Sequence, residues 1–183
     1  VLRAKVEAAP EASTRGLVSD VQRLGTLAEQ LLDLQRLDTD RTDQDLDLPA
    51  LVRRVVGDLA PLLIASDRTI EVQLDDRQPC RGDGPALERV VTNLIQNAIE
   101  HGGRHVTVRV IGAGFEVEDD GPGIPTEERE RVFEPFHRLR PHSTGSGLGL
   151  NLVQQVVERH GGRVSIHGAT GGGTIVRVEL TRG

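Results

Sequence analysis

The 183-residue sequence contains no methionine, tryptophan or tyrosine, and only three phenylalanines, Phe115, Phe133 and Phe136. Its core must therefore be built from leucine, valine and isoleucine. A single cysteine, Cys80, excludes an internal disulfide and fits a reducing compartment. No apolar run approaches the roughly 20 residues that a membrane-spanning helix needs. Lysine is nearly absent as well, since Lys5 is the only one, and any anion-binding site must draw its positive charge from other groups.

The charge balance is mildly acidic, with 22 basic and 28 acidic residues and a net charge of −6. Such a balance argues against non-specific binding to nucleic acid or to an anionic membrane surface. The length suits one ordinary domain with an appendage. No signal peptide is visible and the chain starts at Val1. We expect a piece of a longer protein, located in the cytoplasm, with any contact to an inner membrane made through other segments.

Residues 1–45 have the character of helices. Residues 1–9 resemble the end of a helix that Pro10 stops. From Leu17 to Leu37, apolar residues recur every three or four positions, which is typical of an amphipathic helix with a coiled-coil-like seam. We predict a helical hairpin that dimerises into a four-helix bundle through residues 1–40. The alternative is a helix that packs on its own domain. Residues 38–45 are polar and predict a linker.

From residue 46 to residue 183 the pattern indicates a second domain of mixed α/β type. The expected elements are a strand at 46–48, a helix from Pro49, a strand at 69–74, a helix over 85–101, a hairpin of 106–111 with 115–118, a helix over 148–160, and a hairpin of 163–167 with 174–180. Helices and antiparallel hairpins in this order predict an α/β sandwich, with one mixed sheet and helices on one face.

Two asparagines stand out on the helix predicted over 85–101. Asn93 and Asn97 are four residues apart, so they lie together on the flank of an apolar stripe. That stripe consists of Leu87, Val91, Leu94 and Ala98. Asparagine is a poor helix former, and two of them within one helix favour a role in a pocket. A satisfied polar edge of the core is the structural alternative.

Two glycine-rich segments follow this helix. Asp119-Asp120-Gly121-Pro122-Gly123-Ile124 comes at a predicted strand end, where glycine lets the backbone approach a flat ligand and a carboxylate accepts a hydrogen bond. The alternative is an ordinary turn without a ligand, because Asp-Gly-Pro-Gly is also a common turn sequence. Gly145-Ser146-Gly147-Leu148-Gly149-Leu150 precedes a helix, whose N–H groups attract an anion. The segment matches neither the dinucleotide-binding fingerprint nor the P-loop.

Taken together and in order, these motifs resemble those of sensor histidine kinases. The two-asparagine helix, the Asp119–Gly123 segment, Phe133–Phe136 and Gly145–Gly149 match the N, G1, F and G2 boxes of that family. The resemblance covers residues 12–183, and residues 17–38 resemble the second helix of the family's dimerisation domain. It implies the Bergerat-type ATP-binding fold of the GHKL ATPase superfamily.

The resemblance also implies a site for ATP and Mg²⁺. Asn97 would bind Mg²⁺, Asn93 would line the phosphate region, and Asp119 would accept from the adenine amino group. The segment from His137 to Ser146 would form a mobile lid. The implied ATP-binding residues are Asn93, Asn97, His101, Asp119, Gly121, Gly123, Ile124, Arg138, Gly145, Ser146, Gly147, Leu148, Gly149, Leu150 and Thr174. Because Lys5 lies outside this set, Mg²⁺, backbone N–H groups and arginines must neutralise the phosphates.

The sequence departs from the family pattern in two ways. Glu100 stands where the family often has a lysine or arginine, so we expect it to face solvent or to pair with an arginine. The phospho-acceptor histidine is missing from its expected position, because the six histidines lie between residues 101 and 167. We nominate no substitute and leave the catalytic residue unknown.

We therefore expect the ATP-binding core of a histidine protein kinase that cannot phosphorylate itself. In the whole protein, the γ-phosphate would pass to a histidine and then to a response-regulator aspartate. The expected partners are a second copy of the chain and a receiver domain, without nucleic acid. Two alternatives stay open: a nucleotide-binding switch module that transfers no phosphate, and another ATPase of the same superfamily.

Overall fold

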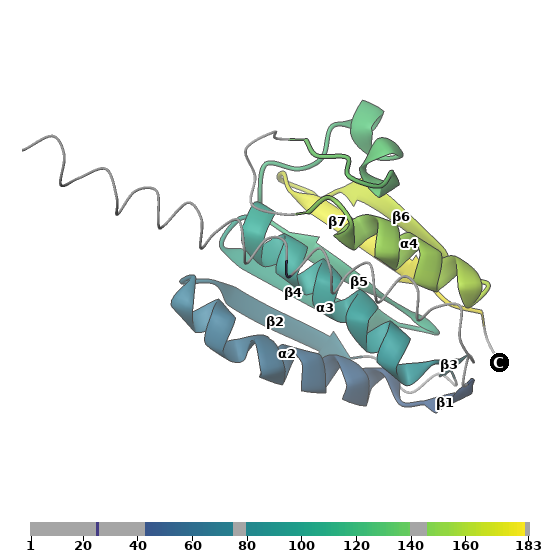
Figure 1. Cartoon of the computed structure of the whole chain (residues 1–183). Coiled ribbons are helices and arrows are strands. Elements are labelled where there is room, and N and C mark those ends of the chain that lie inside the picture. Colours follow the sequence, from purple (N-terminus) through teal and green to yellow (C-terminus); the bar gives the residue numbers. More distant parts are fainter. Residues whose placement is uncertain (1–24, 26–42, 75–79, 140–145, 182–183) are drawn as a thin grey trace, which may run out of the picture.

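A computed structural model describes residue 25 and residues 43–74, 80–139 and 146–181 (Figure 1). The predicted helical hairpin therefore lies outside the described residues except for residue 25, and so does most of the linker predicted over residues 38–45. The last two residues of that linker, Gln44 and Asp45, belong to a strand, β1 (Gln44–Leu46). Within the described residues, no helix is long and apolar enough to cross a membrane.

The domain is built around a five-stranded mixed sheet. Its strand order is β2-β4-β5-β7-β6, in which only the β2–β4 pair is parallel. The predicted mixed sheet is confirmed. The bounds of its strands are β2 Thr69–Leu74, β4 His105–Ile111, β5 Gly114–Asp119, β6 Arg163–Gly168 and β7 Thr174–Glu179.

Three helices cover one face of this sheet: α2 (Leu48–Ala65), α3 (Gly84–His101) and α4 (Gly149–Arg159) (Figure 1). The strands show the alternation that such an arrangement requires. In β4 the side chains of Val106, Val108 and Val110 are buried in the core, whereas Arg109, between them, lies on the opposite face. The predicted apolar stripe of α3 is buried in the same core. The α/β sandwich with its helices on one face is thus confirmed.

A second, two-stranded sheet differs from the sequence-based prediction. Strand β1 (Gln44–Leu46) pairs with β3 (Cys80–Gly82), so the strand predicted at 46–48 actually begins two residues earlier. The reason is that Asp47 caps α2, accepting a hydrogen bond from Ala50 N–H at 3.0 Å, and Leu48 is already helical. Strand β3 was not predicted, because three residues are too few to give a periodic signal.

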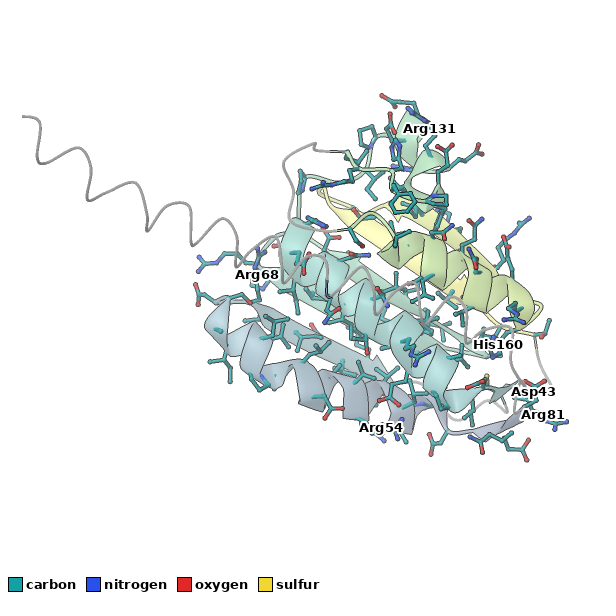
Figure 2. The ribbon with its side chains drawn as sticks, viewed as in Figure 1. Asp43, Arg54, Arg68, Arg81, Arg131 and His160 are labelled. Carbon is teal, nitrogen blue, oxygen red and sulfur yellow. The ribbon has the colours of Figure 1, made fainter. Side chains whose placement is uncertain are left out.

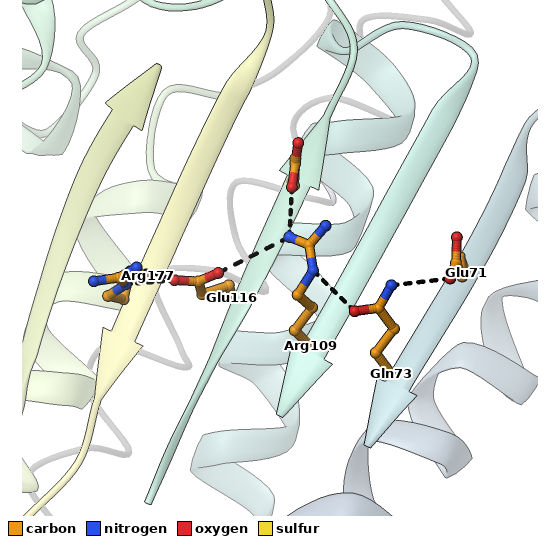
Figure 3. Close-up of polar contacts among 6 residues, drawn as sticks. Glu71, Gln73, Arg109, Glu116 and Arg177 are labelled. Carbon is orange, nitrogen blue, oxygen red and sulfur yellow. Dashed lines mark hydrogen bonds and ion pairs between the residues drawn. The ribbon is translucent and has the colours of Figure 1, made fainter. Parts of the chain in front are cut away.

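The face of the sheet away from the helices carries a network of charged side chains (Figure 3). The strand register places Gln73, Arg109, Glu116 and Arg177 in one row across β2, β4, β5 and β7. Glu116 is only 5% exposed and pairs with Arg177 on one side and Arg109 on the other. Arg109 also pairs with Glu118 and donates from Nε to Gln73 at 3.1 Å. Among the described residues, the charged side chains on this face are therefore neutralised by ion pairs with one another.

A buried histidine fixes α4 relative to α3. His160, labelled in Figure 2 at the C-terminal end of α4, donates from Nδ1 to the Val156 carbonyl at 2.7 Å. Its Nε2 accepts from the Asp83 N–H at 3.0 Å, so the ring is neutral with its proton on Nδ1. Asp83 also caps α3. The two helices that position the site are consequently joined at the ends farthest from it.

Candidate functional site

A pocket of about 330 Å³ opens between α3, the ends of β5 and β7, and the start of α4. It brings together residues from the predicted glycine-rich segments and the two-asparagine helix. Of the predicted site residues, twelve line it: Asn93, Asn97, His101, Asp119, Gly123, Ile124, Arg138, Ser146, Gly147, Gly149, Leu150 and Thr174.

The two asparagines of α3 lie opposite the first residue of α4. Asn93 donates from Nδ2 to the Arg89 carbonyl at 2.9 Å, and this bond fixes the direction of its amide oxygen. A Cβ added to Gly149 would lie 2.9 Å from that oxygen and 3.8 Å from the Asn97 amide. A side chain at this position would therefore require the Asn93 amide to move, whereas glycine lets the helix start close to both asparagines. Both amides are half-buried on the flank of α3, as the sequence predicts.

The N-terminus of α4 is arranged to receive an anion. The residue before it, Leu148, makes no side-chain capping bond, so the first N–H groups of the helix are available for a ligand. Ser146 Oγ accepts from the Leu148 N–H at 3.1 Å. Gly147 has φ +76° and its carbonyl accepts from Phe136 N–H at 2.9 Å. A Cβ on Gly147 would lie 2.8 Å from the Phe136 carbonyl carbon, so this contact also requires glycine.

The other end of the pocket is formed by Asp119, the last residue of β5. Its Oδ1 accepts from Gly121 N–H at 2.8 Å, and it lies opposite Thr174 of β7 in the strand register. Burial raises the pKa of Asp119 above the usual range of aspartate, although hydrogen bonds from Gly121 and Thr174 act in the opposite direction. Val117 and Ile124 contribute apolar walls. A carboxylate beside such walls suits a flat, partly polar ring.

Glu100, one of the two departures from the family pattern, lines this pocket. It is exposed, as expected, and its Oε2 lies 3.8 Å from Nε2 of His101 rather than beside an arginine. No group of three or more histidine, cysteine, aspartate or glutamate side chains forms a metal cluster among the described residues. A single amide oxygen, such as that of Asn97, is a ligand that suits a Mg²⁺ ion with phosphate oxygens and water as its other ligands.

Sequence reasoning did not nominate ten of the lining residues as site residues: Leu94, Gln96, Ala98, Glu100, Val117, Pro122, Val132, His137, Leu139 and Val176. Most are apolar wall residues whose role depends on the packing of the helices against the sheet. His137 carried a signal, because it directly precedes Arg138 in the segment after Phe136. Two of the predicted residues, Gly121 and Leu148, do not line the pocket, although Gly121 donates to Asp119 and Leu148 directly precedes α4. Gly145 lies outside the described residues.

Comparison with known proteins assigns the chain to a family. The family described as "Histidine kinase-, DNA gyrase B-, and HSP90-like ATPase" matches residues 82–183. The chain belongs to this family. The matched residues include α3, both glycine-rich segments and every strand of the large sheet except β2. The chain therefore carries the nucleotide-binding ATPase domain of the family.

Among curated proteins, the relatives of this ATPase domain are sensor kinases. The chain is 33% identical to the signal transduction histidine-protein kinase AfsQ2 of Streptomyces coelicolor, over 93% of this chain and 33% of that protein. It is 35% identical to the sensor protein kinase PmrB of Pseudomonas aeruginosa, over 94% of this chain and 39% of that protein. The chain thus spans only about a third of these relatives. The predicted resemblance to sensor histidine kinases is confirmed.

Solved structures agree with this result. The mycobacterial sensor histidine kinase MprB matches with a TM-score of 0.65 and 32% identity, over 77% of this chain and 97% of that chain. A structure of full-length ShkA in complex with AMPPNP matches with a TM-score of 0.75 and 25% identity, over 93% of this chain and 38% of that chain. The fold of this ATPase domain is therefore that of histidine kinase catalytic domains.

Proposed function

We propose that this domain binds ATP with Mg²⁺ and presents the γ-phosphate to an acceptor histidine of a two-component sensor kinase. The observation that carries the proposal is the meeting of three kinds of group in one pocket. These are the amides of α3, the uncapped N-terminus of α4, and the carboxylate at the end of β5. The amides suit a metal-bound phosphate, the helix N-terminus suits an anionic oxygen, and the carboxylate suits a base with an amino group.

In this proposal the adenine ring lies between Asp119 and the apolar side chains of Ile124 and Val176. Asp119 accepts a hydrogen bond from the 6-amino group, and Gly121 holds the carboxylate in the required orientation. A 6-oxo base would present an acceptor to an acceptor, so the site should select ATP over GTP.

The phosphates in this proposal lie between the asparagines and the start of α4. Backbone N–H groups of that helix donate to their oxygens, and Gly149 allows the close approach that this requires. Mg²⁺, with the Asn97 amide oxygen as a protein ligand, neutralises phosphate charge. Phosphoryl transfer needs chiefly positioning and charge stabilisation from the protein, and this is what the pocket supplies.

The partners follow from the sensor-kinase relatives and belong to the same proposal. The acceptor imidazole lies in a dimerisation domain, the chain dimerises through residues 1–40, and the phosphoryl group passes on to a receiver-domain aspartate. The relatives AfsQ2 and PmrB, of which this chain spans about a third, support this assignment through their names as kinases.

Two measurements test the proposed function. Titration calorimetry of the 183-residue chain should detect ATP binding that strengthens with Mg²⁺ and is far tighter than GTP binding. Radiolabelled ATP should then phosphorylate a longer chain that carries an acceptor histidine, and the label should be acid-labile and alkali-stable, as expected of a phosphoramidate. ATP binding without any such labelling in the longer chain would instead favour a nucleotide-binding switch that transfers no phosphate.

A further inference from the structure

We propose that His137, held by Glu128, is a phosphate-binding residue of this pocket, which donates a hydrogen bond from its imidazolium form to the nucleotide phosphates. The inference rests on the proposed binding of ATP. It assigns His137 to the phosphate-binding part of the pocket. It also implies that the protein takes up a proton when the phosphates of ATP bind.

The imidazole of His137 is fixed by a carboxylate. Its Nε2 lies 2.8 Å from Oε2 of Glu128, and the two side chains are 16% and 23% exposed. The second oxygen of Glu128, Oε1, pairs with Arg131 at 2.9 Å. Glu128 ends the short helix η1 (Thr126–Glu128) and Arg131 begins η2 (Arg131–Phe133); Arg131 is labelled in Figure 2 at the edge of the domain that these two helices form.

The backbone places His137 at the phosphate end of the pocket. Phe136, its neighbour, donates from its N–H to the Gly147 carbonyl, and a Cβ on Gly147 would lie 2.9 Å from the His137 carbonyl oxygen. Two residues later, Gly149 lies against the Asn93 amide oxygen. His137 therefore lines the pocket beside the start of α4. The base end, marked by Asp119, is formed by the ends of β5 and β7.

The unused ring nitrogen determines what His137 can bind. Nε2 is engaged by Glu128, while Nδ1 has no hydrogen-bond partner among the described residues. In the neutral ring with its proton on Nε2, Nδ1 is an acceptor and would repel a phosphate oxygen. A second proton makes Nδ1 a donor. A phosphate at this nitrogen therefore requires the imidazolium form.

The surrounding charges favour this protonation once phosphates are bound. Glu128 faces the ring from η1, and Arg131 of η2 faces Glu128 rather than the ring. Arg138 follows His137 along the chain, and Glu100 of α3 lines the same pocket. Bound phosphates would add negative charge on the Nδ1 side while Glu128 holds the Nε2 side. With no lysine among the described pocket residues, a protonated His137 would add its positive charge to that of Arg138.

A purely structural role makes different predictions. If the pair served only to hold η1 and η2 in place, its loss would weaken all pocket ligands in proportion and lower the melting temperature. If His137 binds phosphate, its loss weakens ligands according to the phosphates that they carry. A comparison of ATP affinity with adenosine affinity therefore distinguishes the two roles, because the two ligands share the base and the ribose and differ in the phosphates.

The test compares His137→Gln and Glu128→Gln in the 183-residue chain with matched controls outside the pocket. His167→Gln, on the edge strand β6, and Glu127→Gln, next to Glu128 on η1, serve as these controls. In calorimetry, His137→Gln should lower the affinity for ATP about tenfold. Glu128→Gln should weaken ATP less, and adenosine affinity should stay within about twofold in both variants. Both controls should bind ATP and adenosine like the wild type.

Calorimetry in buffers of different ionisation enthalpy provides a second measurement. The wild-type protein should take up protons when it binds ATP at about pH 7.5, and His137→Gln should take up fewer. ATP affinity of the wild type should consequently fall as pH rises, and more steeply than that of the variant. Equal ATP affinity, or equal proton uptake, in wild type and His137→Gln would overturn the inference. Parallel losses of ATP and adenosine would overturn it too.

Nuclear magnetic resonance on the wild-type protein covers the case in which a variant fails to fold. In protein labelled with ¹⁵N-histidine, ATP should shift the His137 ring signals from the imidazole to the imidazolium position, and adenosine should not. Unchanged ring signals with ATP bound would refute the phosphate contact. Failure of the wild type to bind either ATP or adenosine would instead count against the proposed function itself.

Discussion

Replacing Asp119 by asparagine should separate nucleotide recognition from stability. Oδ1 of Asp119 accepts from Gly121 N–H at 2.8 Å. An asparagine must keep its oxygen there, so its NH₂ group is forced into the position of the other carboxylate oxygen. That group would meet the 6-amino group of adenine donor to donor. A hydrogen bond to a charged group is worth about 1.5–3 kcal/mol, so Asp119→Asn should weaken ATP roughly ten- to a hundredfold.

The same substitution should leave the stability of the ligand-free protein close to that of the wild type, because removal of a buried charge offsets the loss of an acceptor oxygen for Thr174. Burial raises the pKa of Asp119 in the folded state, so its ionised form destabilises the fold at every pH above that raised pKa. This destabilisation grows as the pH rises from the pKa of Asp119 in the unfolded chain, about 3.9, to its raised pKa in the folded protein, and it is absent at a pH below both pKa values. Asparagine carries no charge, and so removes this cost at neutral pH.

Calorimetry and thermal unfolding check both halves of this prediction. Asp120→Asn is the matched control, because Asp120 does not line the pocket and an asparagine oxygen can still accept from His105 N–H. The control should bind ATP like the wild type. Asp119→Asn should also narrow the preference for ATP over GTP, since its NH₂ group can donate to a 6-oxo base. Unchanged ATP affinity in Asp119→Asn, or equal ATP and GTP affinity in the wild type, would refute the adenine assignment.

Three further predictions concern other parts of the domain. Asn97→Ala should abolish the Mg²⁺ dependence of ATP affinity while leaving adenosine binding and the melting temperature nearly unchanged, because Asn97 flanks the buried stripe of α3; a fall in melting temperature without ligand would favour a structural role. Gly147→Ala should destabilise the protein by about 1–3 kcal/mol in urea unfolding, because φ is +76° and the new methyl group would collide with Phe136; unchanged stability would contradict this. Glu116→Gln should lower the free energy of unfolding by about 1–2 kcal/mol. It should not change ATP affinity, because the charged network lies on the sheet face away from the helices. Glu71→Gln, at the exposed end of the network, should lower the free energy of unfolding by less than about 0.5 kcal/mol, and equal losses in the two variants would argue against the network.

Labelling with radioactive ATP gives a prediction for the chain as a whole. The 183-residue chain should bind ATP but not phosphorylate itself, because its six histidines lie between residues 101 and 167 and none occupies the acceptor position of the helical hairpin. Efficient labelling that maps to one of these six histidines would show that the acceptor has been misassigned.

The sequence by itself determined most of the elements and the site residues that each element carries. Periodicity of two and of 3.6 residues predicted β2 and the buried stripe of α3, because these patterns follow directly from strand and helix geometry. It also predicted that Asn93 and Asn97 share the flank of that stripe. The spacing of glycines after Asp119 and before Leu150 predicted two turns, and glycines of both turns line the pocket. These are local features, set by residues within about one helical turn or one strand of each other.

Only the tertiary structure decided which groups meet across the fold. His160 accepts from the Asp83 N–H 77 residues away, and Arg177 pairs with Glu116 61 residues away, so no short-range pattern encodes either contact. The pairing of His137 with Glu128 depends in the same way on how η1 and η2 fold back beside the pocket. Strand β3 forms only because β1 lies beside it. Packing of helices on a sheet is a non-local property, and it alone turns separate motifs into one pocket.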